Sequence, residues 1–313
     1  MLRYRLLFGT LFIVVLIGLI VADDRLGQSA FAQDAPAIVR AVGLARLDGL
    51  LTVAILAGLV ILGSGELHRL LTKTGCAPLR TWPALMSVAL VVIPFVAANG
   101  LSGDRATLLA DAASYTVTCL TIAVIGSCVL VVARRRTNGA VAAIGATLLM
   151  IVYLGLLPQY IIRLRVFGPV GAAWLMLYFI FTVKVCDIGA YFTGRAIGRH
   201  KLIEWLSPKK TVEGLLGGVA ASVVLAVGVP LLVERLADPS SPMQNLFPPL
   251  LRCASFGILM ALIGQAGDLL ESLIKRDAAA KDASSAIPAF GGLLDILDSL
   301  LLTAPLACWI LLE

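Results

Sequence analysis

Long apolar runs recur along this chain and constrain its fold more than any other feature. Nine of them approach the length of about 20 residues that a helix needs to cross a bilayer. They lie at residues 6–22, 47–64, 83–99, 112–133, 140–157, 169–187, 212–233, 250–267 and 293–312. The 313-residue chain is 59% hydrophobic and 14% charged, with a mean hydropathy of +0.97, which excludes an ordinary soluble domain. The sequence therefore predicts an all-α polytopic membrane protein with about nine transmembrane helices.

The first apolar run has two interpretations. Arg3 and Arg5 precede it, and Ala30-Phe31-Ala32 after it resembles the cleavage site of a signal peptide. That site lies far beyond the end of the apolar run, so we expect an uncleaved first helix and keep the signal peptide as the alternative.

The distribution of Lys and Arg predicts the orientation in the membrane. With the N-terminus in the cytoplasm, seventeen of the 25 basic residues fall on the cytoplasmic side, as the positive-inside rule requires. Arg163 and Arg165 fall on the opposite side and fit the rule poorly. Two charge-rich loops, 188–211 and 275–292, are predicted to face the same compartment, the cytoplasm.

Several common classes of site have little support. The six cysteines form no CxxC pair and mostly lie in apolar runs, so we expect neither disulfides nor a zinc site. His68 and His200 are far apart, and neither a P-loop nor an HExxH motif occurs. The net charge of +6 is explained by the cytoplasmic loops, so no nucleic-acid partner is expected.

The last third of the chain carries an unusual set of polar residues. Asp268, Glu271, Ser272 and Lys275 follow one another at offsets that place them on one face of a helix. Downstream, Pro288, Gly291 and Gly292 interrupt any continuous helix, and Asp295 and Asp298 then share a face of the next one. The pattern predicts a helix, a polar loop and a second helix whose acidic faces can meet.

Acidic residues near a membrane interior need partners. Even a lenient insertion scale assigns a cost of about 2.5 to 3.5 kcal/mol to an ionisable group at the bilayer centre. A metal-phosphate site would provide such partners. The alternative is a solvated loop with helix-capping acids.

A second polar cluster precedes the segment 212–233. Lys184, Asp187 and Tyr191 are spaced for one helix face, and a basic loop follows them. Ser207, Lys209, Lys210 and Thr211 then come just before a helix N-terminus, an arrangement that suits a polyanionic phosphate. The alternative is a positively charged loop in which Ser207 or Thr211 only caps the helix.

These motifs resemble those of the phosphatidate cytidylyltransferases, also called CDP-diacylglycerol synthases. The C-terminal match comprises Ser272, Lys275, Arg276, Lys281, Asp282, Pro288, Gly291, Gly292, Asp295 and Asp298. The upstream match comprises Asp187, Ala190, Tyr191, Gly194, Arg195 and residues 207–214. Two positions depart from the pattern: Phe290 stands where the family has His, and Ile296 where it has Arg.

The resemblance implies transfer of the cytidylyl group of CTP to phosphatidic acid, giving CDP-diacylglycerol and pyrophosphate. It implies Mg²⁺ as the cofactor, held by Asp268 and Asp295 with Asp298 next in line, and leaves open a second monovalent or divalent cation. Lys275 joins these three as a catalytic residue. The residues expected to bind substrate are Asp187, Ser207, Lys209, Lys210, Thr211, Ser272, Arg276, Lys281 and Asp282.

The resemblance also implies an organisation and a location. Residues 1–168 would be N-terminal transmembrane helices, and 169–313 a C-terminal catalytic transmembrane domain with both polar loops cytoplasmic. The protein would lie in a bacterial inner membrane, with CTP, phosphatidic acid and the bilayer as partners and a homodimer as an option. The alternatives are a CTP-dependent enzyme for another lipid, such as a polyprenol kinase, an ion-coupled transporter, and an inactive scaffold.

Overall fold

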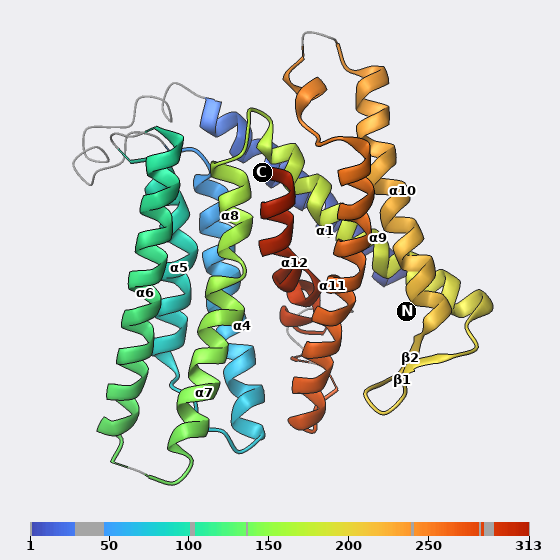
Figure 1. Ribbon diagram of the computed structural model, residues 1–313. Coiled ribbons are helices and arrows are strands. Elements are labelled where there is room, and N and C mark those ends of the chain that lie inside the picture. The colour runs from blue at the N-terminus through green and yellow to red at the C-terminus, as the bar shows by residue number, and fades with distance from the viewer. Residues whose placement is uncertain are drawn as a thin grey trace.

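A computed structural model describes residues 2–28, 47–100, 104–135, 137–238, 241–281, 283–284 and 291–312. It is a bundle of long helices (Figure 1). In the first half these are α1 (Leu2–Gln28), α4 (Leu50–Lys73), α5 (Thr81–Ala98), α6 (Arg105–Ala133), α7 (Ala140–Ile151) and α8 (Gln159–Val166). In the second half they are α9 (Ala172–Ile197), α10 (Val212–Leu236), α11 (Leu250–Asp277) and α12 (Leu294–Leu312). The prediction of an all-α polytopic membrane protein is confirmed.

Eight helical segments in the described part of the chain are long and apolar enough to cross a membrane, and they correspond to the second to ninth predicted segments. Several run further than predicted: α9 continues to Ile197 and α11 to Asp277. Polar side chains confined to one face do not end a helix, because the backbone hydrogen bonds continue beneath them. Asp187 and Asp268 therefore lie within helices and not at their ends.

One span is not a regular α-helix. Residues 140–166 are a single span in which α7 passes through a π-helical turn, η1 (Val152–Leu156), into α8. At Gly155 the turn meets α5 so closely that a Cβ atom would lie 2.7 Å from Ser87 Cα. Such turns often mark functional positions within helices, and this one carries the buried Tyr153.

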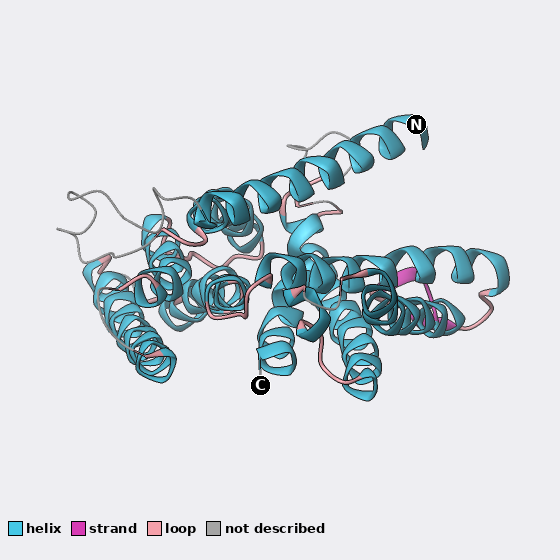
Figure 2. Cartoon of the chain, turned by 90° about the horizontal axis from the view of Figure 1, so that it is seen from above, coloured by secondary structure: helices cyan, strands magenta, loops and turns pink. Residues whose placement is uncertain are grey.

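The first predicted segment lies within α1, which crosses the bundle at a steep angle. Seen from above, α1 extends along its length while α4 to α6 are viewed almost end-on (Figure 2). Its far end is fixed by Asp23, whose carboxylate accepts hydrogen bonds from Leu51 N at 2.8 Å and Thr52 Oγ1 at 2.9 Å.

Arg165 completes this attachment. Its side chain is buried, with Nε 2.9 Å from Asp23 Oδ2 and Nη2 3.0 Å from Asp48 Oδ1. The residue fits the positive-inside rule poorly because its charge is matched inside the protein and is not offered to the solvent.

Helices α9 and α10 pack with almost no space between them. A Cβ atom on Gly214 would lie 2.9 Å from Ala190 O, and one on Gly218 would lie 2.9 Å from Cys186 O. Small residues four apart allow this approach of two backbones within a membrane. The packing fixes the position of the polar end of α9 relative to the start of α10. The domain boundary expected at residue 168 falls between α8 and α9 and stays a prediction.

The sequence predicted an irregular basic loop after α9, but part of this segment forms regular strands. Strands β1 (Lys201–Ile203) and β2 (Ser207–Thr211) form an antiparallel hairpin in which Lys201 pairs with Thr211 and Ile203 with Ser207. Thr211 caps α10, since its Oγ1 accepts a hydrogen bond from Gly214 N at 3.1 Å. The hairpin lies beside the start of α10 (Figure 1). We call the end of the bundle that carries this hairpin, the end of α11 and the start of α12 the motif face.

Candidate active site

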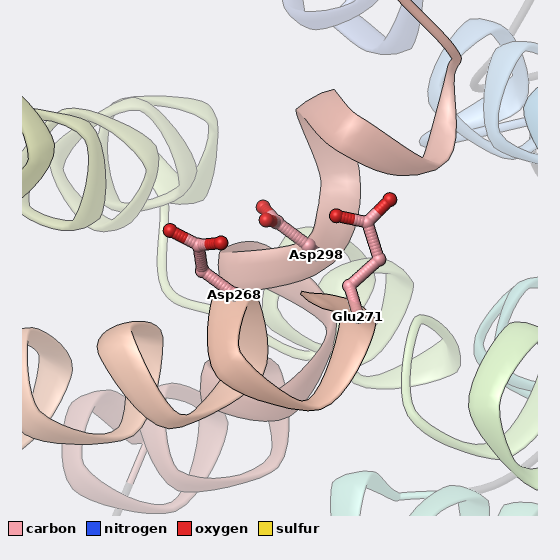
Figure 3. Close-up of side chains that lie close together, drawn as sticks. All are labelled: Asp268, Glu271 and Asp298. Atoms are coloured by element: carbon pink, nitrogen blue, oxygen red, sulfur yellow. The ribbon is translucent and has the colours of Figure 1, made fainter. Parts of the chain in front are cut away.

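Three carboxylates gather where α11 meets α12. Asp268 and Glu271 come from α11 and Asp298 from α12, and one oxygen of each lies within 4.8 Å of the others. Figure 3 shows the three side chains converging between the two helices. A Cβ atom on Gly267 would lie 2.5 Å from Asp298 O, so the glycine lets the helices approach at this level. We call these three residues the acid cluster.

The acid cluster has the properties of a cation site. Glu271 is 2% exposed and Asp298 6%, so solvent does little to screen the repulsion between them. Glu271 Oε1 is buried and has no hydrogen-bond partner among the described residues. Three hard oxygen ligands on rigid helices, one of them unsatisfied, fit Mg²⁺, which combines a few carboxylates with phosphate and water oxygens.

Lysines from three elements surround the acid cluster. Lys210 Nζ, from β2, lies 2.7 Å from Asp268 Oδ2, and Lys275 Nζ, from α11, lies 2.7 Å from Glu271 Oε2. Lys184, from α9, donates to Ser299 Oγ at 2.8 Å, one residue after Asp298. The site thus pairs a concentrated negative charge with cations that can bind phosphate.

Asp187 belongs to the edge of this arrangement. Its Oδ1 accepts a hydrogen bond from Gln265 Nε2 at 3.2 Å, and its Oδ2 lies 3.8 Å from Lys184 Nζ. The carboxylate is therefore placed to orient Lys184.

Asp295 lies next to the acid cluster and is not one of its three members, although the resemblance assigned it to the metal together with Asp268. Its Oδ1 is 2.6 Å from Lys275 Nζ, and its Oδ2 accepts from Gly292 N at 2.6 Å and Ala283 N at 3.2 Å. The first turn of a helix has unpaired backbone N–H groups, and Asp295 uses its carboxylate to bind those of the chain leading into α12. It holds Lys275 and the loop, while Asp298, one turn later, faces Asp268.

Glu66 is a site residue that the sequence analysis did not identify. It lies on α4 and is 4% exposed. Its carboxylate accepts from Ser284 Oγ at 2.5 Å and from Leu294 N at 3.0 Å. The N-terminal half thus helps to fix the start of α12. The available signal was a single acid shortly after the apolar run 47–64, because a carboxylate that continues a membrane-spanning helix is rarely without function.

Tyr153 also approaches the site from the N-terminal half. Its side chain is 2% exposed, and its hydroxyl has no hydrogen-bond partner among the described residues. The hydroxyl is therefore a buried donor without an acceptor among these residues.

The remaining predicted substrate residues are distributed over the motif face. Ser272 Oγ is 3.5 Å from Asp268 Oδ1. Lys209, Arg276 and Lys281 are exposed, and Ser207 is half-buried at the start of β2. Thr211 acts as the helix cap of α10, the role that the alternative interpretation gave it. Asp282 and Phe290 lie outside the described residues, and Ile296 is half-buried in the first turn of α12.

The described part of the chain thus combines eight helical segments long and apolar enough to cross a membrane with a cluster of three carboxylates and neighbouring lysines near one end of the bundle. Comparison with known proteins identifies the family. The model of the cytidylyltransferase family matches residues 35–312, and this chain belongs to that family. The match includes most of the N-terminal helices as well as the motif region.

Named relatives cover much of the chain. It is 32% identical over 294 residues to a phosphatidate cytidylyltransferase of Synechocystis, covering 86% of this chain and 91% of the relative. It is 32% identical over 240 residues to a phosphatidate cytidylyltransferase of Chlamydia pneumoniae, covering 75% and 74%. An uncharacterised Escherichia coli protein, YnbB, is 37% identical over 135 residues, covering 43% and 41%.

Proposed function

We propose that the protein transfers the cytidylyl group of CTP to phosphatidic acid, forming CDP-diacylglycerol and pyrophosphate. The observation that carries this proposal is the acid cluster, three carboxylates with neighbouring lysines near one end of a bundle of apolar helices. Membership of the cytidylyltransferase family and the names of the relatives support the choice of substrates.

The reaction joins two polyanions. A phosphate oxygen of phosphatidic acid attacks the α-phosphorus of CTP, the bond from that phosphorus to the bridging oxygen breaks, and pyrophosphate leaves with the electron pair. The nucleophile is already ionised near neutral pH, so no general base is needed. Catalysis then depends on positioning and on electrostatic stabilisation of the transferring phosphoryl group.

The residues divide this work between them. Asp268, Glu271 and Asp298 would hold Mg²⁺, which neutralises phosphate charge and stabilises the charge that develops on the leaving oxygens when it is bound. Lys184, beside Ser299, and Lys210, beside Asp268, would bind phosphate oxygens.

A second group of residues keeps the first in place. Asp295 positions Lys275 and the loop before α12, and Glu66 holds the first backbone N–H of that helix. Lys209, Arg276 and Lys281 are exposed at the motif face, where they suit the triphosphate of CTP arriving from solvent.

We place the motif face in the cytoplasm of a bacterial inner membrane. Most basic residues of the described chain lie at this face, including Arg69, Lys73, Arg80, Lys209 and Arg276. Cytoplasmic loops carry this excess of Lys and Arg. CTP is a cytoplasmic nucleotide, so the proposed reaction also requires the motif face to lie on the cytoplasmic side.

The test is an assay with purified protein in detergent, radiolabelled CTP, Mg²⁺ and phosphatidic acid. The expected product is labelled CDP-diacylglycerol, with one pyrophosphate released per turnover, and Asp298→Asn should reduce the rate at least a hundredfold. Asp238→Asn, at the opposite face, is the matched control. Product from polyprenol in place of phosphatidic acid, ion flux without CTP, or no reduction in Asp298→Asn would overturn the proposal.

A further inference from the structure

A second polar site lies away from the acid cluster. A groove of about 820 Å³ separates the last turns of α4 from the first turns of α5 at the motif face. Arg69, Lys73 and Arg80 line it, and no residue of the acid cluster does. Three cations in one groove, without an acidic residue among those lining it, favour an anionic ligand.

The groove changes from polar to apolar along α4. Ile61 and Leu62 line its deeper part and are 55% and 66% exposed, as expected of side chains that face lipid. Arg69 and Lys73 lie two to three turns nearer the end of the helix. A ligand that fills the groove must therefore have an anionic head and an apolar tail, which are the parts of an anionic phospholipid. Basic pockets between transmembrane helices bind such headgroups.

Ser64 supplies an independent indication of a ligand. It lines the groove, is 3% exposed, and its hydroxyl has no hydrogen-bond partner among the described residues. Serine and threonine hydroxyls in helices commonly bond the carbonyl one turn earlier, as Thr72 Oγ1 does with His68 O at 2.7 Å. A buried hydroxyl left without a partner is costly, so a ligand acceptor at this point would stabilise it.

The depth of Ser64 matches a particular part of a phospholipid. It precedes Arg69 by five residues, which is about 7.5 Å along a helix axis at 1.5 Å per residue. The ester carbonyls of a phospholipid lie below its phosphate, on the side of the acyl chains. A phosphate bound at Arg69 would thus place an ester oxygen near the level of Ser64.

We propose that the groove between α4 and α5 binds an anionic phospholipid of the surrounding bilayer. Arg69, Lys73 and Arg80 bind the phosphate, Ser64 donates to an ester oxygen, and the acyl chains lie along Ile61 and Leu62. This site is separate from the one in which the reaction is proposed, and binding there requires neither CTP nor a divalent cation.

Photolabelling of the full-length protein tests the proposal. The protein is placed in phosphatidylcholine nanodiscs with a small fraction of phosphatidylglycerol that carries a photoreactive group in one acyl chain, without CTP or Mg²⁺. Labelled residues are located by peptide mass spectrometry. We expect labelling at Ile61, Leu62 and Ala84, with unlabelled phosphatidylglycerol competing at least fivefold better than phosphatidylcholine.

Matched variants identify the groups responsible. The triple variant Arg69→Gln, Lys73→Gln, Arg80→Gln should lose at least fivefold of the labelling in the groove. Arg135→Gln, Arg235→Gln, Arg252→Gln removes the same charge elsewhere and should lose none. Ser64→Ala should reduce labelling two- to threefold, whereas Ser87→Ala, another buried serine whose hydroxyl has no partner among the described residues, should not.

Other outcomes would overturn the proposal. Equal labelling by a photoreactive phosphatidylcholine would show a groove that only accommodates acyl chains. Competition by inorganic phosphate as strong as that by phosphatidylglycerol would show a free-anion site. Unchanged labelling in a groove variant that retains the elution volume and helix content of the wild type would exclude these residues. Because no turnover is measured, failure here is independent of the proposed reaction.

Discussion

Lys210 and Asp268 form an ion pair, with Nζ 2.7 Å from Oδ2, that joins the hairpin after α9 to the acid cluster. The two residues belong to the two polar segments that the sequence singled out, and they meet at one point of the fold. The pair brings the ammonium group of Lys210 directly to a carboxylate of the acid cluster. It makes the hairpin part of the site and not only a connection between spans.

The two adjacent lysines of β2 should therefore differ in importance. Lys210→Met removes the cation at Asp268 and should lower kcat at least tenfold. Lys209→Met removes an equal but exposed charge and should mainly raise the KM for CTP, by no more than about threefold, since exposed ion pairs contribute about 0.2 to 1 kcal/mol. Steady-state kinetics with varied CTP separate the two effects. Equal losses of kcat in both variants would contradict the role given to Lys210.

Lys275 should be important for stability as well as activity. It lies between Glu271 and Asp295, and its removal leaves a buried carboxylate unpaired. Losing one partner of a buried pair costs about 3 to 5 kcal/mol, so Lys275→Met should unfold at a clearly lower temperature. The double variant Lys275→Met, Glu271→Gln should regain much of the loss, because the unpaired charge is gone. Thermal unfolding in detergent measures both, and a single variant as stable as the wild type would refute this pairing.

Glu66 should control the loop between α11 and α12. Glu66→Gln keeps the size of the side chain but presents an N–H group where Leu294 N or Ser284 Oγ now donates. We expect at least a tenfold lower turnover and faster proteolysis within residues 278–293. The control is Glu234→Gln, an exposed glutamate at the end of α10. Limited proteolysis followed by mass spectrometry shows whether cleavage is confined to this loop; cleavage that is unchanged would separate Glu66 from the loop.

Arg163 and Arg165, in the last turn of α8, allow a comparison of two arginines at the end of the bundle opposite the motif face. Arg165→Met leaves the buried Asp23 without its cation and should destabilise the protein by about 3 kcal/mol or more. Arg163 lies over the Tyr160 ring, 5.4 Å from its centroid, and Arg163→Met should cost about 1 kcal/mol or less. The difference in unfolding temperature measures the attachment of α1. Equal shifts would show that Arg165 does not hold this helix.

The spans could be predicted from the sequence because hydropathy and length alone determine which segments cross a bilayer. The ends of the helices could not be predicted in this way, because α9 and α11 continue through Asp187 and Asp268, beyond their apolar parts. The hairpin was missed because Ser207-Pro208-Lys209-Lys210 has few strand-favouring residues. Its pairing depends on the turn and on contacts with α10.

The site shows the same limit at the level of single residues. Helical spacing placed Asp268 with Glu271 and Asp295 with Asp298. It did not show which acid of α12 faces α11, because that depends on the rotation of one helix against the other. Glu66 and Tyr153 reach the site from helices far away in the sequence, and only the three-dimensional packing reveals them as neighbours.

Glu271 and Asp298, and not Asp295, would hold the cation together with Asp268. Binding of Mn²⁺, a spectroscopic substitute for Mg²⁺, can be measured by electron paramagnetic resonance on purified protein without substrates. We expect Glu271→Gln to weaken Mn²⁺ binding at least tenfold and Asp295→Asn to leave it within about twofold while lowering turnover. Tight Mn²⁺ binding in Glu271→Gln together with loss of binding in Asp295→Asn would contradict this assignment of the cation ligands.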